Sequence, residues 1–323
     1  MGLVDQHAHG ILREPPASLD EFRGLFSESP DPRQWPHLAS WLPYRQAIAE
    51  LAERPGCEAT EQAVYQRRLA TDPDEYAASL LRTTGTEWLL VDDGYPAPGS
   101  GHHWEKMGEL AGCPAAPVMR LERVAEEAPG NLDHVRDEVT AARAGGFAAL
   151  KTIAAYRGGL DLDMVPPVRD VLLATLEANE ATGDPLPVQV HAGFGDSDLH
   201  LPRANPGYLK PVIERFRETP FVLLHCYPYV REAGWLAHVY GNVYFDLSLT
   251  IPHVGRPAER VREALELGPV SKLLYASDAA LTPELYFLAA RRWRGALAEV
   301  GLPEEDCRAI LRENALALYR LAA

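Results

Sequence analysis

Cysteine is scarce in this sequence, and its residues are widely scattered, at Cys57, Cys113, Cys226 and Cys307. No C-x-x-C spacing occurs, which argues against both a disulfide framework and a thiolate zinc site. Long apolar runs are also missing, since none approaches the roughly 18 residues that a membrane span needs. A chain with reduced thiols and no such run is most simply expected in the cytoplasm.

Positive charge is also in short supply. The 323 residues include 31 Lys and Arg against 46 Asp and Glu, which gives a formal net charge of −15. Such a surface repels phosphate backbones and anionic lipid, and this argues against nucleic-acid or membrane partners. We expect a small-molecule substrate instead, and a homo-oligomeric assembly.

What the sequence does contain is an alternation of short apolar runs and segments with helical spacing. From residue 86 onward the apolar runs are 87–92, 116–121, 147–153, 187–191, 221–225, 243–247 and 272–277. With the opening run around Val4 they make eight candidate strands, and the helical segments between them indicate a parallel sheet with crossover helices. Eight such units predict an α/β fold of the (β/α)8 barrel type. A doubly wound open sheet is the alternative, but the glycine-rich nucleotide-binding motifs typical of it are absent.

Residues 18–85 do not fit this alternation, because they are rich in helical patterning and punctuated by prolines. We expect a single barrel over 1–323 with a helical insertion at 18–85, after the first strand. Loops that follow strands emerge at the catalytic face of such a barrel, so the insertion could roof the site. A passive stabilising or dimerising role explains it equally well. Two final helices are predicted at 283–300 and 303–321.

Ionisable side chains stand at the ends of the predicted strands. His7 and His9 lie two residues apart, so on a strand their imidazoles would project to the same side. Later strand ends carry Asp93, Arg120, Lys151, His191, His225 and Asp278. Because the carboxyl ends of barrel strands converge, these side chains should become neighbours. A nitrogen and oxygen set of this kind suits zinc, manganese or a similar divalent ion.

Three of these residues are candidates for the chemistry itself. His191 is expected to be a metal ligand, although a core histidine is the alternative. His225 is either a ligand to a second metal or a hydrogen-bond donor to the substrate oxygen. Asp278 can bind a metal with one oxygen, and its other oxygen can take a proton from metal-bound water, whose pKa falls to about 7.

The remaining candidates concern the substrate. Lys151 ends an apolar strand, where an unpaired ammonium is costly to bury. It could be carbamylated and bridge two metals, hold a substrate carboxylate as a free cation, or extend to the barrel rim. Arg120, Arg157 and Tyr156 are candidates for gripping a carboxylate, with surface salt bridges as the alternative for the arginines. Asp93 is a further candidate substrate contact.

Taken together, the motifs resemble the amidohydrolase superfamily, in particular the amidohydrolase-2 branch that includes the N-terminal domain of FluG and nodulin-like proteins. The motifs are DQHAH at 5–9, LKTIAAYRGGL at 150–160, HAGFGD at 191–196, HCYP at 225–228 and ASDA at 276–279. They occur in the expected order and cover essentially the whole chain. No glutamine-synthetase-like domain is expected after the final helices, which weakens any link to glutamine chemistry.

The resemblance implies a metal-dependent hydrolase on a distorted barrel. It implies that His7, His9, His191 and Asp278 reach the metal, that Asp278 is also the proton shuttle, and that His225 is a further ligand or polarises the scissile carbonyl. We expect one or two divalent ions, with zinc favoured and manganese possible.

The expected reaction is hydrolysis of a C–N bond of amide type in a small carboxylated or γ-glutamyl-like substrate. Two alternatives remain open: a metal-dependent non-oxidative decarboxylase on the same barrel, and a non-catalytic metal-binding scaffold. Release of carbon dioxide would identify the first, and a protein purified without metal would favour the second.

Overall fold

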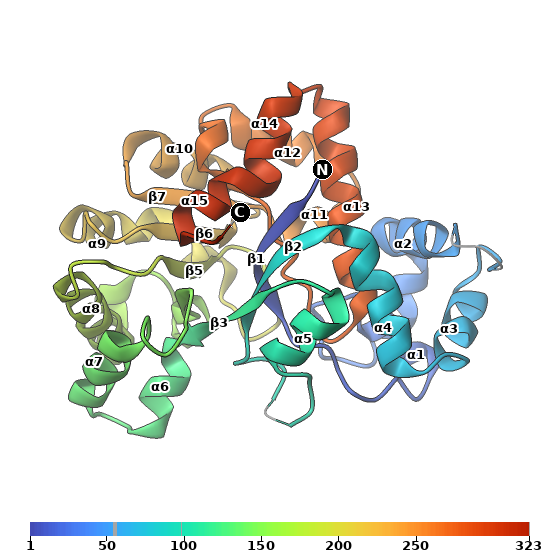
Figure 1. Ribbon diagram of the computed structural model, residues 1–323, viewed down its shortest axis with the longest axis horizontal. Helices are drawn as coiled ribbons and strands as arrows, with labels where there is room; N and C mark the ends of the chain where they lie inside the picture. The colour runs from blue at the N-terminus through green and yellow to red at the C-terminus, as the bar shows by residue number, and fades with distance from the viewer. Residues whose placement is uncertain (54–56, 98, 323) are drawn as a thin grey trace.

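Eight parallel strands form one sheet in sequence order, each hydrogen-bonded to the next (Figure 1). The computed structural model describes residues 1–53, 57–97 and 99–322. The strands are β1 (Leu3–His9), β2 (Thr86–Asp92), β3 (Ala115–Arg120), β4 (Ala149–Thr152), β5 (Val188–Ala192), β6 (Phe221–His225), β7 (Val243–Asp246) and β8 (Leu273–Leu274). Helices lie between them, so the predicted α/β barrel is confirmed.

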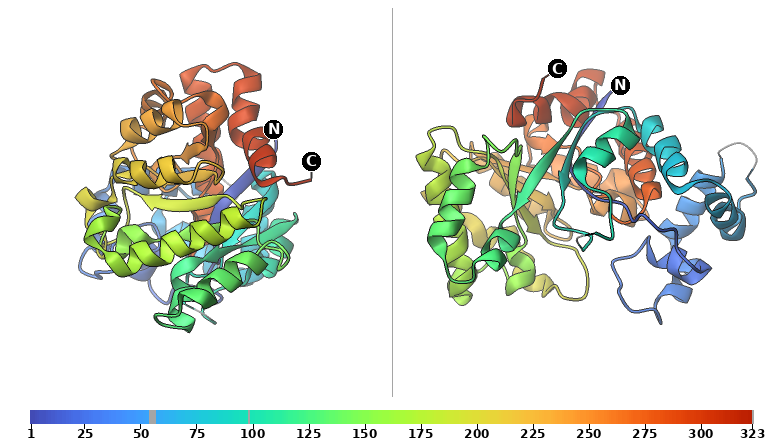
Figure 2. Two further views of the ribbon diagram at one scale, coloured as in Figure 1. Left: turned by 90° about the vertical axis from the view of Figure 1, so that its left-hand side faces the viewer. Right: turned by 60° about the horizontal axis from the view of Figure 1, so that its bottom comes forward.

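The crossover helices surround the strands, as both views of Figure 2 show. They are α5 (Trp104–Ala111), α6 (Leu121–Glu127), α7 (Leu132–Ala141), α8 (Pro166–Ala181), α9 (Lys210–Arg215), α10 (Val230–Val239), α11 (Thr250–His253) and α12 (Pro257–Leu265). Helix α8 illustrates why they form: it has proline in its first turn, where no amide hydrogen is needed, and it buries Leu172 and Leu176 one turn apart.

The barrel is closed irregularly. Strands β1 and β8 share no ladder, but the His9 amide donates to the Ala279 carbonyl (2.9 Å) and the Asp278 amide donates to the His7 carbonyl (2.9 Å). The predicted strand at 272–277 is therefore too long, because the Tyr275 amide donates to the Ile310 carbonyl instead of a neighbouring strand. We call this junction of β1 with residues 275–281 the seam.

The segment that contains Ile310 also differs from the sequence prediction. The predicted helix at 303–321 is divided into α14 (Glu304–Arg308), a π-helical turn (Ala309–Glu313) and α15 (Asn314–Tyr319). The wider turn leaves a carbonyl available to receive the Tyr275 amide. The helix before it, α13 (Pro283–Val300), has the predicted bounds.

In the described part of the chain between β1 and β2, four α-helices gather at one side of the barrel (Figure 1). They are α1 (Leu19–Gly24), α2 (Leu42–Ala52), α3 (Glu61–Leu69) and α4 (Pro73–Leu81). The side chain of Thr60 caps α3, and that of Asp72 caps α4. Arg68 of α3 forms a buried ion pair with Glu284 of α13 (2.5 Å), which fastens these helices to the barrel.

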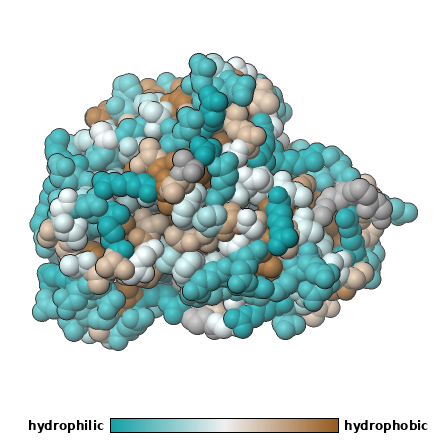
Figure 3. Space-filling view, in the orientation of Figure 1, coloured by the Kyte–Doolittle hydropathy of each residue, from teal (hydrophilic) through white to brown (hydrophobic). Residues whose placement is uncertain are grey.

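The amino end of the barrel is filled by apolar side chains. Val4, Leu90, Val222 and Leu274 are fully buried there and pack against Tyr319 of α15. The face of the molecule drawn in Figure 3 is largely hydrophilic, in keeping with the charge balance. Within the described residues, no helix is both long and apolar enough to cross a membrane.

Candidate metal centre

Three predicted ligands meet at the carboxyl end of the barrel. His7 and His9 come from β1, and Asp278 lies in the seam with a left-handed backbone (φ 49°). The Nε2 atoms of His7 and His9 are 3.1 and 3.4 Å from Asp278 Oδ1. One potential ligand atom from each residue lies within 4.8 Å of the others, a spacing that a single ion can bridge.

The hydrogen bonds around both histidines fix which ring nitrogen carries the proton. His7 Nδ1 is 2.8 Å from the side-chain oxygen of Gln189, and His9 Nδ1 is 3.0 Å from the Asp92 carbonyl. Both partners are acceptors, so each Nδ1 donates and each Nε2 presents a lone pair to Asp278. Burial lowers the pKa of His7 to about 4, which keeps its ring neutral. Lone pairs that face a carboxylate oxygen repel it unless a cation or a proton lies between them, and a divalent metal fits these residues.

A second pair of histidines adjoins this trio. The rings of His191 on β5 and His225 on β6 have centroids 4.3 Å apart, and the Nε2 atom of each is buried without a hydrogen-bond partner among the described residues. His225 Nδ1 lies 2.8 Å from Ser248 Oγ, which itself donates to Asp246. The remaining nitrogen of His225 is therefore an acceptor, and burial holds the pKa of this ring well below its usual range.

Lys151 is almost completely buried beside the trio. Its Nζ is 3.0 Å from His7 Nε2, close enough for the ammonium to donate to that lone pair. Burial lowers the pKa of Lys151 to about 8, although the carboxylates of Asp92 and Asp278 act against that shift. The lysine thus competes with a metal for the same nitrogen of His7.

Arg120, a predicted substrate contact, is engaged within the protein. Its Nε and Nη2 donate to Asp92 Oδ2 at 3.0 and 2.7 Å, and Nη1 donates to the Gly94 carbonyl at 3.2 Å. Burial acts to raise the pKa of Asp92, but the guanidinium together with Lys151 and the two β1 histidines outweighs it and holds this pKa well below its usual range. Because the carbonyl of Asp92 orients His9, Arg120 helps to position a metal ligand.

The other predicted substrate contacts lie in different surroundings. Tyr156 stands beside His191, with ring centroids 4.6 Å apart. Arg157 donates to Glu126 (3.0 Å) near the surface. Asp93 pairs with His103 (2.9 Å), and burial raises its pKa to about 6. Arg120, Tyr156 and Arg157 line the cavity above the metal centre, whereas Asp93 is outside its lining.

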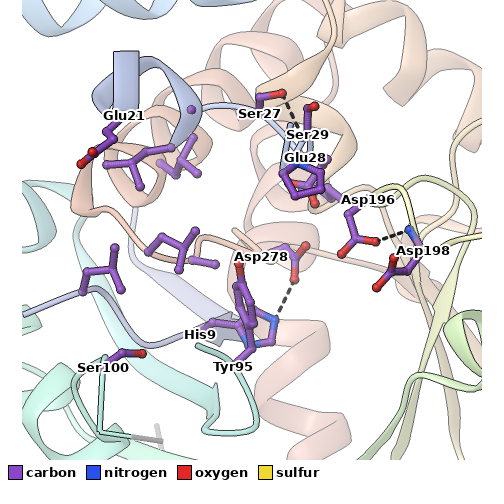
Figure 4. A pocket seen from close by; sticks show the side chains of 18 of the residues that line it. His9, Glu21, Ser27, Glu28, Ser29, Tyr95, Ser100, Asp196, Asp198 and Asp278 are labelled. Atoms are coloured by element: carbon purple, nitrogen blue, oxygen red, sulfur yellow. Dashed lines mark hydrogen bonds and ion pairs between the residues drawn. The ribbon is translucent and has the colours of Figure 1, made fainter. Parts of the chain in front are cut away.

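That cavity has a volume of about 910 Å³ and opens over His9, His191 and Asp278 (Figure 4). Its size is that of a site for a small molecule. Part of its wall comes from the segment around α1, so residues of the 18–85 region do face the site.

Glu28 is a cavity residue that the sequence prediction missed. Its carboxyl group points toward Asp196 and Asp278 (Figure 4). Burial, followed by repulsion from those two carboxylates, raises the pKa of Glu28 to about 8. Glu28 is a single glutamate in a serine- and proline-rich stretch, so no spacing pattern in the sequence marks it as a functional residue. Only its place in the 18–85 region could have indicated that it faces the cavity.

The fold and the site define a class: a metal-dependent hydrolase barrel with a His-x-His strand and a carboxylate after the last strand. A family model described as Amidohydrolase matches residues 128–321. The chain belongs to this amidohydrolase-2 family, which confirms the resemblance of its motifs.

Individual relatives agree with this assignment. FluG of Emericella nidulans is 45% identical over 131 residues, which make up 40% of this chain and 15% of FluG. The chain thus matches only a small part of that protein's length. A crystal structure from Lactobacillus casei, assigned as a metal-dependent hydrolase, is 29% identical, with a TM-score of 0.85 and coverage of 99% of this chain and 95% of that one. An uncharacterised TIM-barrel protein of Bordetella bronchiseptica (14% identity, TM-score 0.55, 99% of both chains) shares the fold.

Proposed function

We propose that this protein hydrolyses a C–N bond of amide type in a small substrate, at a divalent metal held by His7, His9, His191 and Asp278. The observation that carries this proposal is the pair of Nε2 lone pairs directed at Asp278 Oδ1 from 3.1 and 3.4 Å. Zinc is the ion that we favour and manganese the alternative, because the set combines imidazole nitrogen with carboxylate oxygen.

The chain's own residues suit this reaction. A divalent ion bound here would acidify a water molecule and polarise a carbonyl group. Asp278 Oδ2 faces away from the two β1 histidines and lies 3.5 Å from His225 Nδ1, so it can take a proton from the attacking water and pass it to the leaving amine. Ser248 accepts from His225 Nδ1, and this favours an acceptor or ligand role for His225 over a donor role.

We further propose that Lys151 is carbamylated. Its neutral amine would add carbon dioxide and release one proton, and the resulting carboxylate could bridge two ions. The low pKa of this lysine, about 8, supports the step because the reactive form is the neutral amine. The same change would remove the ammonium that competes for His7.

We also propose which residues contact the substrate, where the protein is located in the cell, and that it forms a homo-oligomer. Tyr156 lines the cavity beside His191, while Arg120 and Arg157 already have carboxylate partners, so a substrate carboxylate would have to share them. All four cysteines are free, which supports a cytoplasmic location. Light scattering on the purified protein tests the proposed homo-oligomer, because it measures the molar mass of the particle in solution.

The proposed reaction is tested by product analysis. The metal-loaded enzyme is incubated with a panel of small amides, including γ-glutamyl amides, while released amine and carbon dioxide are measured. We expect amine release, and we expect Asp278→Asn to reduce it by at least about 100-fold, the usual contribution of a proton-transferring group. Asp198→Asn, which changes a carboxylate of the same cavity wall, is the matched control. Carbon dioxide as the product would identify a decarboxylase and overturn the proposal.

A further inference from the structure

The cavity wall carries carboxylates that form no ion pair with a lysine or arginine of the described residues. Glu28, Asp196 and Asp278 come from three separate segments and point toward a common space (Figure 4). Asp196 accepts a hydrogen bond from the Asp198 amide (2.9 Å), and neither Asp196 nor Glu28 forms an ion pair with lysine or arginine within the described chain. A metal on the two β1 histidines would compensate Asp278 but would leave the other two carboxylates.

A buried histidine lies behind Glu28, outside the lining of the cavity. The side chain of His253 is only 4% exposed, and its Nδ1 donates to the Leu249 carbonyl (2.8 Å). Its Nε2 therefore carries a lone pair, lies 3.8 Å from Glu28 Oε1, and has no hydrogen-bond partner among the described residues. The rings of Trp41 and Phe194 pack around the imidazole, with centroids 5.9 and 5.7 Å away, and hold it in this orientation.

The cations of the cavity are occupied elsewhere. Arg120 is bound to Asp92, Arg157 to Glu126, and Lys151 donates to His7. Arg13, at the exposed rim, donates to the Gly101 carbonyl. This part of the wall therefore offers acidic groups and hydrogen-bond acceptors with which no lysine or arginine of the described lining is paired. Burial and repulsion from Asp278 and Asp196 raise the pKa of Glu28 to about 8, and a cation bound beside this carboxyl group would favour its charged form.

We propose that Glu28 and Asp196, with the unpartnered acceptor of His253 behind Glu28, form a subsite for a primary ammonium group of the substrate. An ammonium has three N–H donors and one positive charge, which match the acceptors and the charge of this wall. The inference rests on the proposed function and narrows it: the amide substrate carries a protonated amino group away from the scissile bond, as amino-acid amides and amides of diamines do. The 18–85 region would then select the substrate through Glu28.

Binding can be measured without turnover. The metal-loaded, full-length protein is titrated calorimetrically at neutral pH with n-butylammonium, n-butanol and n-butyrate, which share a chain and differ in the head group. We expect only n-butylammonium to bind. Glu28→Gln should weaken it about tenfold, the effect of losing one charge-assisted contact. Glu14→Gln, the same substitution at the exposed rim of the cavity, should leave binding unchanged.

Other outcomes overturn the subsite. Three results would contradict it. The protein could bind n-butyrate more tightly than n-butylammonium, or Glu28→Gln could bind n-butylammonium as tightly as the unmodified protein. Added divalent metal could also bind to these carboxylates in place of the amine. If Glu28→Gln fails to fold, Asp196→Asn takes its place, with the same expectation. Turnover separates the two proposals: hydrolysis of amides with no preference for a protonated amino group removes only the subsite, whereas amine binding without any amide hydrolysis removes only the proposed reaction.

Discussion

At the scale of single residues, the state of the metal centre depends on the protons of His7 and His9 and on the chemical form of Lys151. Gln189 and the Asp92 carbonyl hold the protons of His7 and His9 on Nδ1, and this directs both lone pairs inward. As an ammonium, Lys151 satisfies one of those lone pairs from 3.0 Å. As a carbamate it would become a neighbour of the metal instead. The centre can therefore change from a hydrogen-bonded cluster to a metal site through chemistry at one nitrogen.

Labelling with carbon dioxide tests this interpretation of Lys151. We expect the metal-loaded protein, equilibrated with ¹³C-bicarbonate, to show a carbamate carbon resonance, because burial leaves a substantial fraction of the amine neutral. The resonance should be absent in Lys151→Met and present in Lys210→Met, where an exposed lysine is lost. A spectrum without the resonance in the unmodified enzyme, or one that retains it in Lys151→Met, would contradict carbamylation.

Residues differ in how readily the sequence alone reveals them. His7, His9 and Asp278 were predictable because each follows from strand periodicity and from the convergence of strand ends. Glu28 was not, since it reaches the cavity from a loop segment whose path depends on packing. The engagement of Arg120 by Asp92 was equally hidden, because opposite charges on neighbouring strands are visible only once the register is known.

At the scale of elements, periodicity predicted the alternation of strands and helices, and strands β2 to β7 have bounds within two residues of those expected. Strand β8 was not predictable in this way. Its apolar pattern continues to residue 277, but the Tyr275 amide is taken by Ile310, which is distant in sequence. A hydrophobic pattern in the sequence indicates which residues are buried. The length of a strand also depends on which carbonyl group lies opposite each amide, and the pattern does not contain that information.

The attachment of the helices between β1 and β2 gives a prediction at this scale. Arg68 donates to Glu284 and Thr282 within the interior, and Tyr76 of α4 donates to the same carboxylate. Arg68→Met should destabilise the protein by about 3 kcal/mol, because it leaves a buried carboxylate without its cation. Urea unfolding measures the change. Limited proteolysis should then cut first within the 18–85 region.

The control for this prediction is Arg33→Met. That arginine forms an ion pair with Asp31 on the exposed surface of the same region. Exposed pairs contribute little to stability, so we expect its unfolding curve to match that of the unmodified protein. Equal losses in both variants would mean that the buried pair does not fasten the helices to the barrel.

At the scale of the whole molecule, the metal centre and the closure of the barrel share the same residues. The seam lacks a ladder between β1 and β8, and main-chain bonds at His7 and His9 join the two sides. Those same residues, with Asp278, supply the proposed ligands from opposite sides of the seam. A bound ion would therefore stabilise the barrel where its hydrogen bonding is least regular.

Removal of the metal should accordingly destabilise the protein at the seam. A ligand present at a thousand times its Kd adds about 4 kcal/mol to stability, so a chelator should lower the Tm measurably. Amide hydrogen exchange should rise first in residues 3–9 and 275–281, while β5 and β6, which pair over five register positions, stay protected. Asp278→Asn should be insensitive to the chelator, whereas Asp198→Asn should respond like the unmodified protein. A uniform rise in exchange across all strands would show that the ion stabilises the fold without acting through the seam.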